Sequence, residues 1–163
     1  MCYIGNFYKT RNTTEEDLNF VVDGLYKKSV ANPDGFGLVA YSKDGNVLES
    51  RKMKFDHKLI LKALKKYNVV HVHLRMATTG SKCLDNVHMF GKGAWRFSHN
   101  GIVSGKVRKA EALDTSDSKE FFELLVRKDC LKDNGQVAYR RVDTLAKESG
   151  FISSRRIDGN RVL

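Results

Sequence analysis

The chain has 163 residues, and its 41% hydrophobic content and single proline exclude a disordered or fibrous protein. This length suits one domain, covering residues 1–163, whose core needs no disulfide or metal to be stable. The three cysteines lack CxxC spacing and no apolar run could span a bilayer. We therefore expect a cytoplasmic protein of a reducing compartment that does not bind membranes.

The net charge is +10, from 29 Lys and Arg residues against 19 Asp and Glu residues. Such an excess attracts phosphates or an acidic partner to the surface. The basic residues form clusters, but no aromatic residues are interleaved with them as they are in single-stranded nucleic-acid sites. A solvated face is therefore the favoured interpretation, with an acidic protein or a nucleic acid kept as alternative partners.

In chain order, the first predicted elements are a strand, a helix and a hairpin. Alternating apolar and polar or small residues over 2–8 predict a half-buried strand. One of the threonines at 13–14 caps a helix, which ends at the turn over 32–35. Two further strands, at 36–42 and 47–53, flank an Asp-Gly turn and form a hairpin.

The remaining elements mix helices and short strands. They are a helix over 56–67, a buried strand over 69–74, short strands over 95–98 and 102–103 around His99-Asn100-Gly101, helices over 118–127 and 137–149, and a hairpin around 158–160. Trp95 and Phe97 are expected in the core. Strands that cluster first, with helices interspersed and later grouped, predict an α+β layered domain.

Four segments concentrate residue types that a core does not need: Cys2, 32–37, 73–80 and 98–101. Six motifs stand out in these segments and in the residues that follow them. They are Cys2 directly after Met1, D-G-x-G at 34–37, R-x-A-T-x-G at 75–80, N-x-H-x-F at 86–90, H-N-G at 99–101, and the triplet Ser116, Asp117 and Ser118. In this order, over most of the chain, they resemble the class II glutamine amidotransferases, which are N-terminal nucleophile hydrolases. The resemblance implies a four-layer αββα sandwich that releases ammonia from the glutamine side chain through a cysteinyl thioester, without a cofactor or metal.

Cys2 is the predicted nucleophile. A thiol attacks poorly until its proton is removed, and a free α-amine, with a reference pKa of about 7.7 to 8.0, can remove it at neutral pH. Removal of Met1 would therefore give one residue both the nucleophile and the base. The alternative is that Cys2 is a small buried residue of an edge strand.

Asn100 and Gly101 are the predicted oxyanion hole. Attack on an amide builds a tetrahedral oxyanion, which needs preorganised donors, and the loss of one donor typically costs about 3 to 4 kcal/mol of barrier. The Asn100 side-chain NH₂ and the Gly101 backbone N–H can act as these donors, and the resemblance assigns them this role. Asn-Gly is also the commonest hairpin signal, so a tight turn at these residues is the competing interpretation, and the two are compatible.

The predicted substrate site recognises the two charges of glutamine. Arg75 can fork its guanidinium onto the α-carboxylate, and Asp117 can lie near the α-ammonium group. The alternatives are a surface arginine at the end of a strand and a helix cap ahead of 118–127. The resemblance adds four further residues to this site: Gly35, Thr78, Thr79 and His88.

The histidines do not predict a metal centre. His71, His73, His88 and His99 have no carboxylate or cysteine at matching ligand spacing, so packing or loop hydrogen bonding is the favoured interpretation. Gly35 and Gly37 permit a close backbone approach near the nucleophile, and Asp34 can hold the turn.

The chain departs from the resemblance after Asp117. The stretch 118–120 differs from the usual acidic residue, and few strands remain, which leaves open a second sheet truncated at the C-terminus. No synthetase domain is present, so we expect a separate protein to accept the ammonia, unless it is released to water. Two rivals remain: a γ-glutamyl amide as the substrate, and a catalytically silent protein that binds an acidic protein or a nucleic acid.

Overall fold

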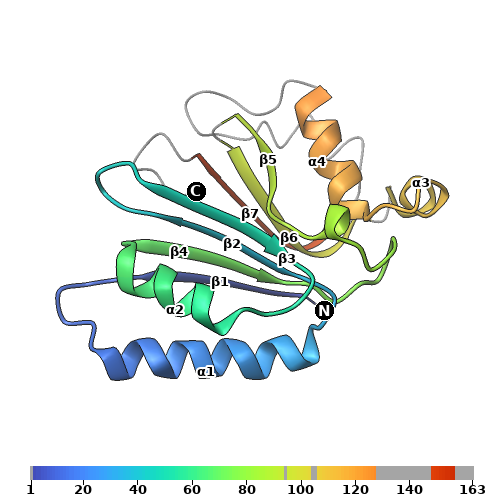
Figure 1. The fold of residues 1–163 in the computed structure, drawn as a ribbon. Helices are drawn as coiled ribbons and strands as arrows, with labels where there is room; N and C mark the ends of the chain where they lie inside the picture. The colour runs from blue at the N-terminus through green and yellow to red at the C-terminus, as the bar shows by residue number, and fades with distance from the viewer. Residues whose placement is uncertain (1, 94, 104–105, 128–147, 157–163) are drawn as a thin grey trace.

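Figure 1 shows two antiparallel β-sheets with helices beside them, which confirms the predicted α+β class. The computed structural model describes residues 2–93, 95–103, 106–127 and 148–156, the last of these by their backbone alone. Among these residues, no helix is long and apolar enough to cross a membrane.

The first sheet has four strands in the order β1-β4-β2-β3, and all neighbours are antiparallel. Its strands are β1 (Tyr3–Tyr8), β2 (Phe36–Tyr41), β3 (Val47–Lys52) and β4 (Val69–Leu74). β2 and β3 form the predicted hairpin, in which Gly45 adopts a φ of 87°. The pairing of β1 with β4 sets Tyr3 opposite Leu74, and so brings the N-terminal end of the described chain to the end of β4.

Helices α1 (Glu15–Ala31) and α2 (His57–Lys66) cover one face of this sheet (Figure 1). Each begins where the sequence predicts, because a side chain caps it: Thr14 Oγ1 accepts from the Asp17 N–H at 3.1 Å, and Asp56 caps α2 in the same way. Their apolar faces pack on alternate residues of β2 and β4 in one core, which contains Val22, Leu25, Phe36, Leu38, Ile60, Leu64, Val70, Val72 and Leu74.

The second sheet has the strand order β5-β6-β7. Its strands are β5 (Phe90–Lys92), β6 (Trp95–Val103) and β7 (Glu148–Arg156). Helix α4 (Asp117–Arg127) packs on β5 and β6 (Figure 1), which confirms the helix predicted at 118–127. Phe97, Phe121 and Phe122 lie at the centre of this contact, and Trp95 and Phe97 are buried as predicted.

Several predictions for this half of the chain are corrected. The two short strands predicted around 99–101 are one strand, β6, because it pairs with β7 along its whole length. Residues 148 and 149 belong to β7 and not to the helix predicted over 137–149; the rest of that helix, and the hairpin around 158–160, lie outside the described residues. The sequence did not predict β5, the 3-10 turn η1 (Leu84–Asn86) or the helix α3 (Val107–Ala112).

Alternation along β4 places polar residues on the face turned away from the helices. Val70 and Val72 pack with α1 and α2, so His71 and His73 point the opposite way. There His71 Nε2 lies 2.9 Å from Ser98 Oγ of β6. This face of the first sheet therefore meets the second sheet, and a buried polar layer separates them.

Candidate active site

Cys2 lies at the end of β4 because β1, which it precedes, pairs with that strand. The Met76 N–H donates to Cys2 Sγ at 3.4 Å, and the thiol donates to the Met76 carbonyl at 3.5 Å. These two residues are 74 positions apart in the sequence. The side chain of Cys2 is partly buried, in a contact that the register of β1 on β4 dictates.

The surroundings of Cys2 keep its thiol protonated. Burial raises the pKa of Cys2 above its usual value, and the Met76 N–H and the Arg75 guanidinium only partly oppose this rise. A thiol with a raised pKa is not ready for attack at neutral pH. An attack by this thiol at neutral pH would therefore require a base within reach of the sulfur.

Arg75 follows β4 directly and is only 2% exposed, so its interpretation as a surface arginine is wrong. Its Nη2 donates to the Thr79 carbonyl at 2.9 Å, and its Nη1 donates to the Ser81 carbonyl at 3.0 Å. Burial lowers the pKa of Arg75, and the nearby Cys2 is the largest opposing influence. The loop after β4 thus folds around a guanidinium that lies within electrostatic reach of the sulfur.

Asp117, 3% exposed, joins this loop to the second sheet. Thr79 Oγ1 donates to its Oδ1 at 3.0 Å and accepts from its N–H at 3.1 Å. The Val103 N–H donates to Asp117 Oδ2 at 2.6 Å. Asp117 does not cap α4 with its side chain, because Ser116 Oγ accepts from the Lys119 N–H at 3.1 Å and takes that role.

Asp34 contacts the loop after β4, in addition to the role in the turn over 32–35 that the sequence predicts. Its Oδ2 accepts from the Ala77 N–H at 2.8 Å, and Lys82 pairs with its Oδ1 at 2.9 Å. The adjacent Gly35 has a φ of 151°, and a Cβ there would collide with Val87. Glycine is therefore required at this position, because the Val87 side chain fills the space that a Cβ would occupy.

Asn86, 1% exposed, ties the loop after β4 to the segment before α4. Its Nδ2 donates to the carbonyls of Ser81 and Asp114 at 3.1 and 3.2 Å. Its Oδ1 accepts from the Ser116 N–H at 2.9 Å and from Thr115 Oγ1 at 3.1 Å. No site role was predicted for Asn86, although its place in the N-x-H-x-F motif was an available signal.

Asn100 and Gly101 lie within β6, so the tight turn expected at these residues is wrong. They pair with Phe151 and Gly150 of β7, and Gly101 has a φ of 154°. Alternation puts Asn100 on the same face of β6 as Ser98, which faces the first sheet. Within the described contacts neither residue is hydrogen-bonded to Cys2, and the buried Oδ1 of Asn100 has no hydrogen-bond partner there.

The two remaining predicted substrate residues differ in exposure. Thr78 is exposed at the surface of the loop after β4. His88 is 2% exposed, its ring stacks on His73 with centroids 3.9 Å apart, and its Nδ1 accepts from the His99 N–H at 3.2 Å. His88 thus belongs to the buried polar layer between the sheets.

The buried histidines of this layer are neutral. Burial lowers the pKa of His71 to about 4 and that of His73 to about 3, and holds the pKa of His88 well below its usual value. In the part of the chain that the structure describes, no group of three or more His, Cys, Asp or Glu side chains could hold a metal ion. In this layer His71 lies within hydrogen-bond distance of Ser98, and the ring of His73 stacks on that of His88.

The structure thus brings Cys2, Arg75, Thr79 and Asp117 together, from segments that are far apart in the sequence. Such an arrangement supplies a thiol, a guanidinium and a carboxylate at one end of the two sheets. No protein-family model matches the sequence, and no curated protein matches it either.

Proposed function

We propose that this chain hydrolyses the side-chain amide of glutamine, with Cys2 as the nucleophile, as class II glutamine amidotransferases do. We further propose that its fold is the four-layer αββα sandwich of N-terminal nucleophile hydrolases. The layering in Figure 1 supports this, with α1 and α2 on one sheet and α4 on the other. The contact between His71 and Ser98 supports an arrangement in which the two sheets pack face to face.

One observation carries the proposal: the sulfur of Cys2 lies against Met76, directly after the buried Arg75. An arginine is costly to bury unless it has partners or a ligand. Arg75 has two carbonyls of its own loop as partners and lies within electrostatic reach of Cys2, so we place the carboxylate of an amino-acid substrate beside it. Asp117 provides the negative charge for the ammonium group of the same substrate, across Thr79.

The proposed reaction has two steps, formation of a thioester and its hydrolysis. The α-amine of Cys2, free once Met1 is removed, takes the thiol proton, and the sulfur attacks the amide carbon of glutamine. Asn100 Nδ2 and the Gly101 N–H stabilise the oxyanion, and the proton passes to the departing ammonia as the C–N bond breaks. Water then cleaves the thioester to give glutamate and the free thiol. The raised pKa of Cys2 is the reason that this reaction needs the α-amine as a base.

A second candidate is a catalytically silent protein with a basic surface that binds an acidic protein or a nucleic acid. It is favoured by the hydrogen bonds of Asp117, because both of its carboxylate oxygens already accept from protein donors. Arg75 likewise donates to carbonyls of its own loop. In this candidate these groups hold the loop and take no substrate.

Ammonia release from glutamine separates the two candidates. We expect processed wild-type protein to release ammonia and Cys2→Ala to release none, while its melting temperature stays near the wild-type value. Cys83→Ala is the matched control, since Cys83 is the other free thiol in the described residues, and it should retain activity. Equal release by wild type and Cys2→Ala would refute the nucleophile, and retention of Met1 in the intact mass would favour the silent protein.

A further inference from the structure

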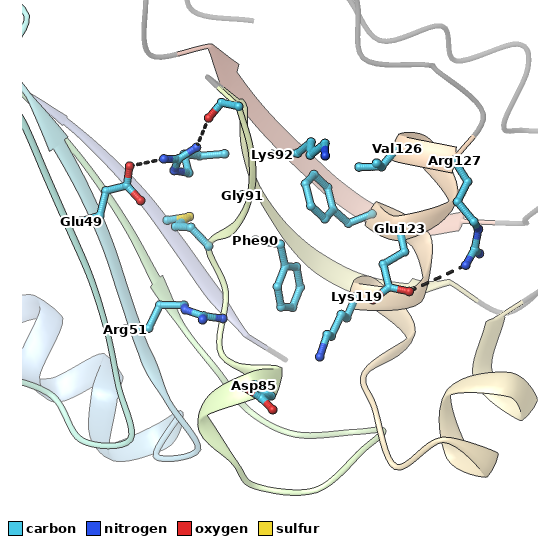
Figure 2. A pocket seen from close by; sticks show the side chains of 14 residues that line it. Glu49, Arg51, Asp85, Phe90, Gly91, Lys92, Lys119, Glu123, Val126 and Arg127 are labelled. Atoms are coloured by element: carbon cyan, nitrogen blue, oxygen red, sulfur yellow. Dashed lines mark hydrogen bonds and ion pairs between the residues drawn. The ribbon is translucent and has the colours of Figure 1, made fainter.

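A pocket of about 690 Å³ lies between β3, β5 and α4 (Figure 2). Cys2, Arg75, Thr79 and Asp117 are not among the residues that line it. Its volume falls in the range of roughly 300 to 1,000 Å³ that is typical of small-molecule sites. The pocket is therefore large enough for a ligand of its own, apart from the site proposed for glutamine.

One wall of the pocket is fixed by Arg96, which joins the two sheets. Its guanidinium pairs with Glu49 of β3 and donates to the carbonyls of Gly93 and Trp95, both at 2.7 Å. A Cβ at Gly91 would lie 3.3 Å from this guanidinium, so the glycine leaves room for Arg96 to lie across β5. Arg96 and Glu49 therefore form an ion pair in which each balances the other's charge.

The floor of the pocket is apolar and belongs to the core. It contains Phe90 and Phe122, whose ring centroids are 6.1 Å apart, and Met89. All three side chains are at most 6% exposed; Phe90 belongs to β5, Met89 directly precedes that strand, and Phe122 belongs to α4. A ring or apolar group of a ligand would thus meet a preformed surface.

The charges around this floor favour an anion. Five basic and three acidic side chains line the pocket, and Glu49 and Glu123 are each paired with an arginine. Three basic residues have no carboxylate partner within the described ranges: Arg51, Lys92 and Lys119. In Figure 2, Arg51 and Lys119 flank Phe90. With Asp85 as the third acidic side chain, the five basic and three acidic residues give the lining a net charge of +2, which attracts an anion.

We propose that this pocket binds an organic phosphate. Its phosphate group lies between Arg51, which can fork two oxygens, and Lys119, which supplies a point charge. Its ring or apolar part lies on Phe90 and Phe122, and Asp85 accepts a hydroxyl or amine of the same molecule. Nucleotides and sugar phosphates share this chemistry. The proposal does not depend on hydrolysis of glutamine.

Isothermal titration calorimetry on the full chain tests the proposal with four probes: AMP, glucose 6-phosphate, inorganic phosphate and adenosine. We expect AMP or glucose 6-phosphate to bind at least roughly tenfold more tightly than inorganic phosphate, because only an organic phosphate also reaches the floor. Whichever of the two binds more tightly identifies the source. Adenosine should bind at least roughly tenfold more weakly than AMP if AMP is the ligand, because it lacks the group that the cations hold.

Surface variants locate the site. Arg51→Gln with Lys119→Gln should weaken binding of the organic phosphate at least roughly tenfold, and Lys92→Glu should weaken it independently. The matched control, Lys58→Gln with Lys62→Gln on the exposed side of α2, removes the same charge outside this pocket and should keep the wild-type affinity. Equal loss in both double variants would overturn the proposal, as would failure of both organic phosphates to bind or an equal affinity for inorganic phosphate. Thermal melting confirms that each variant is folded.

Discussion

Lowering the pH from 6 to 5 should destabilise the protein steeply, because histidines are buried in their neutral form. The folded protein holds the pKa of His71 at about 4 and that of His73 at about 3. In the unfolded chain such side chains titrate near 6.5. Well above pH 6.5 these histidines are neutral in both states. As the pH falls below 6.5, the unfolded chain binds protons that the folded protein does not, so stability falls until the pH passes the folded pKa values.

The size of this effect follows from the two pKa shifts. A histidine that is protonated only in the unfolded chain contributes about 1.4 kcal/mol per pH unit. The unfolded side chains are partly neutral at pH 6, so His71 and His73 together should lower the free energy of unfolding by about 2.4 kcal/mol between pH 6 and pH 5. His88 adds to this fall in the same direction, because burial also lowers its pKa.

Urea unfolding at pH 7, 6 and 5 measures the fall. His73→Phe should reduce it by about 1.2 kcal/mol, because one of the titrating side chains is removed. Val72→Ala, at the neighbouring core position of β4, should lower stability at every pH but keep the full fall. A free energy of unfolding that is the same at pH 6 and pH 5 would refute the burial of neutral histidines between the sheets.

Three further predictions concern the loop after β4. Gly80→Ala should lower the free energy of unfolding, measured by urea denaturation, by about 1 to 3 kcal/mol, since its φ is 70° and a Cβ would collide with Thr115. The control Gly24→Ala, in the open middle of α1, should instead raise this free energy by about 0.5 to 1 kcal/mol. Asn86→Ala should lower the free energy of unfolding by about 2 to 4 kcal/mol, because several buried groups lose their hydrogen-bond partner. A variant as stable as the wild type would contradict this. Arg75→Lys should raise the Michaelis constant for glutamine roughly tenfold, and an unchanged constant would remove Arg75 from the site.

Local signals predicted most of the first sheet and its helices. The cap at Thr14 and the Asp-Gly turn between β2 and β3 are encoded within a few residues of each element, so sequence reasoning can find them. β5 has only three residues, which is too short for an alternating pattern. At Asn100 and Gly101 the local preference for a turn is overridden by pairing with β7, a segment about 50 residues away along the chain.

The candidate site was harder to predict, because its contacts join distant segments. Arg75 and Asp117 were proposed from their charges, but the sequence could not show that Thr79 bridges the loop to Asp117. Asp34 and Asn86 are polar residues in turns, which are usually solvated. Their burial depends on the packing of the loop after β4 between two other segments, and no periodicity reports that packing.

The nucleophile is tested most directly by trapping it. Purified protein is treated with an electrophilic analogue of glutamine, and intact mass and peptide mapping then locate the adduct. We expect a chain that begins at Cys2 and carries one analogue on that residue, with Cys83 unmodified and with protection by excess glutamine. A chain that retains Met1, or an analogue found on Cys83 with Cys2 unmodified, would contradict it.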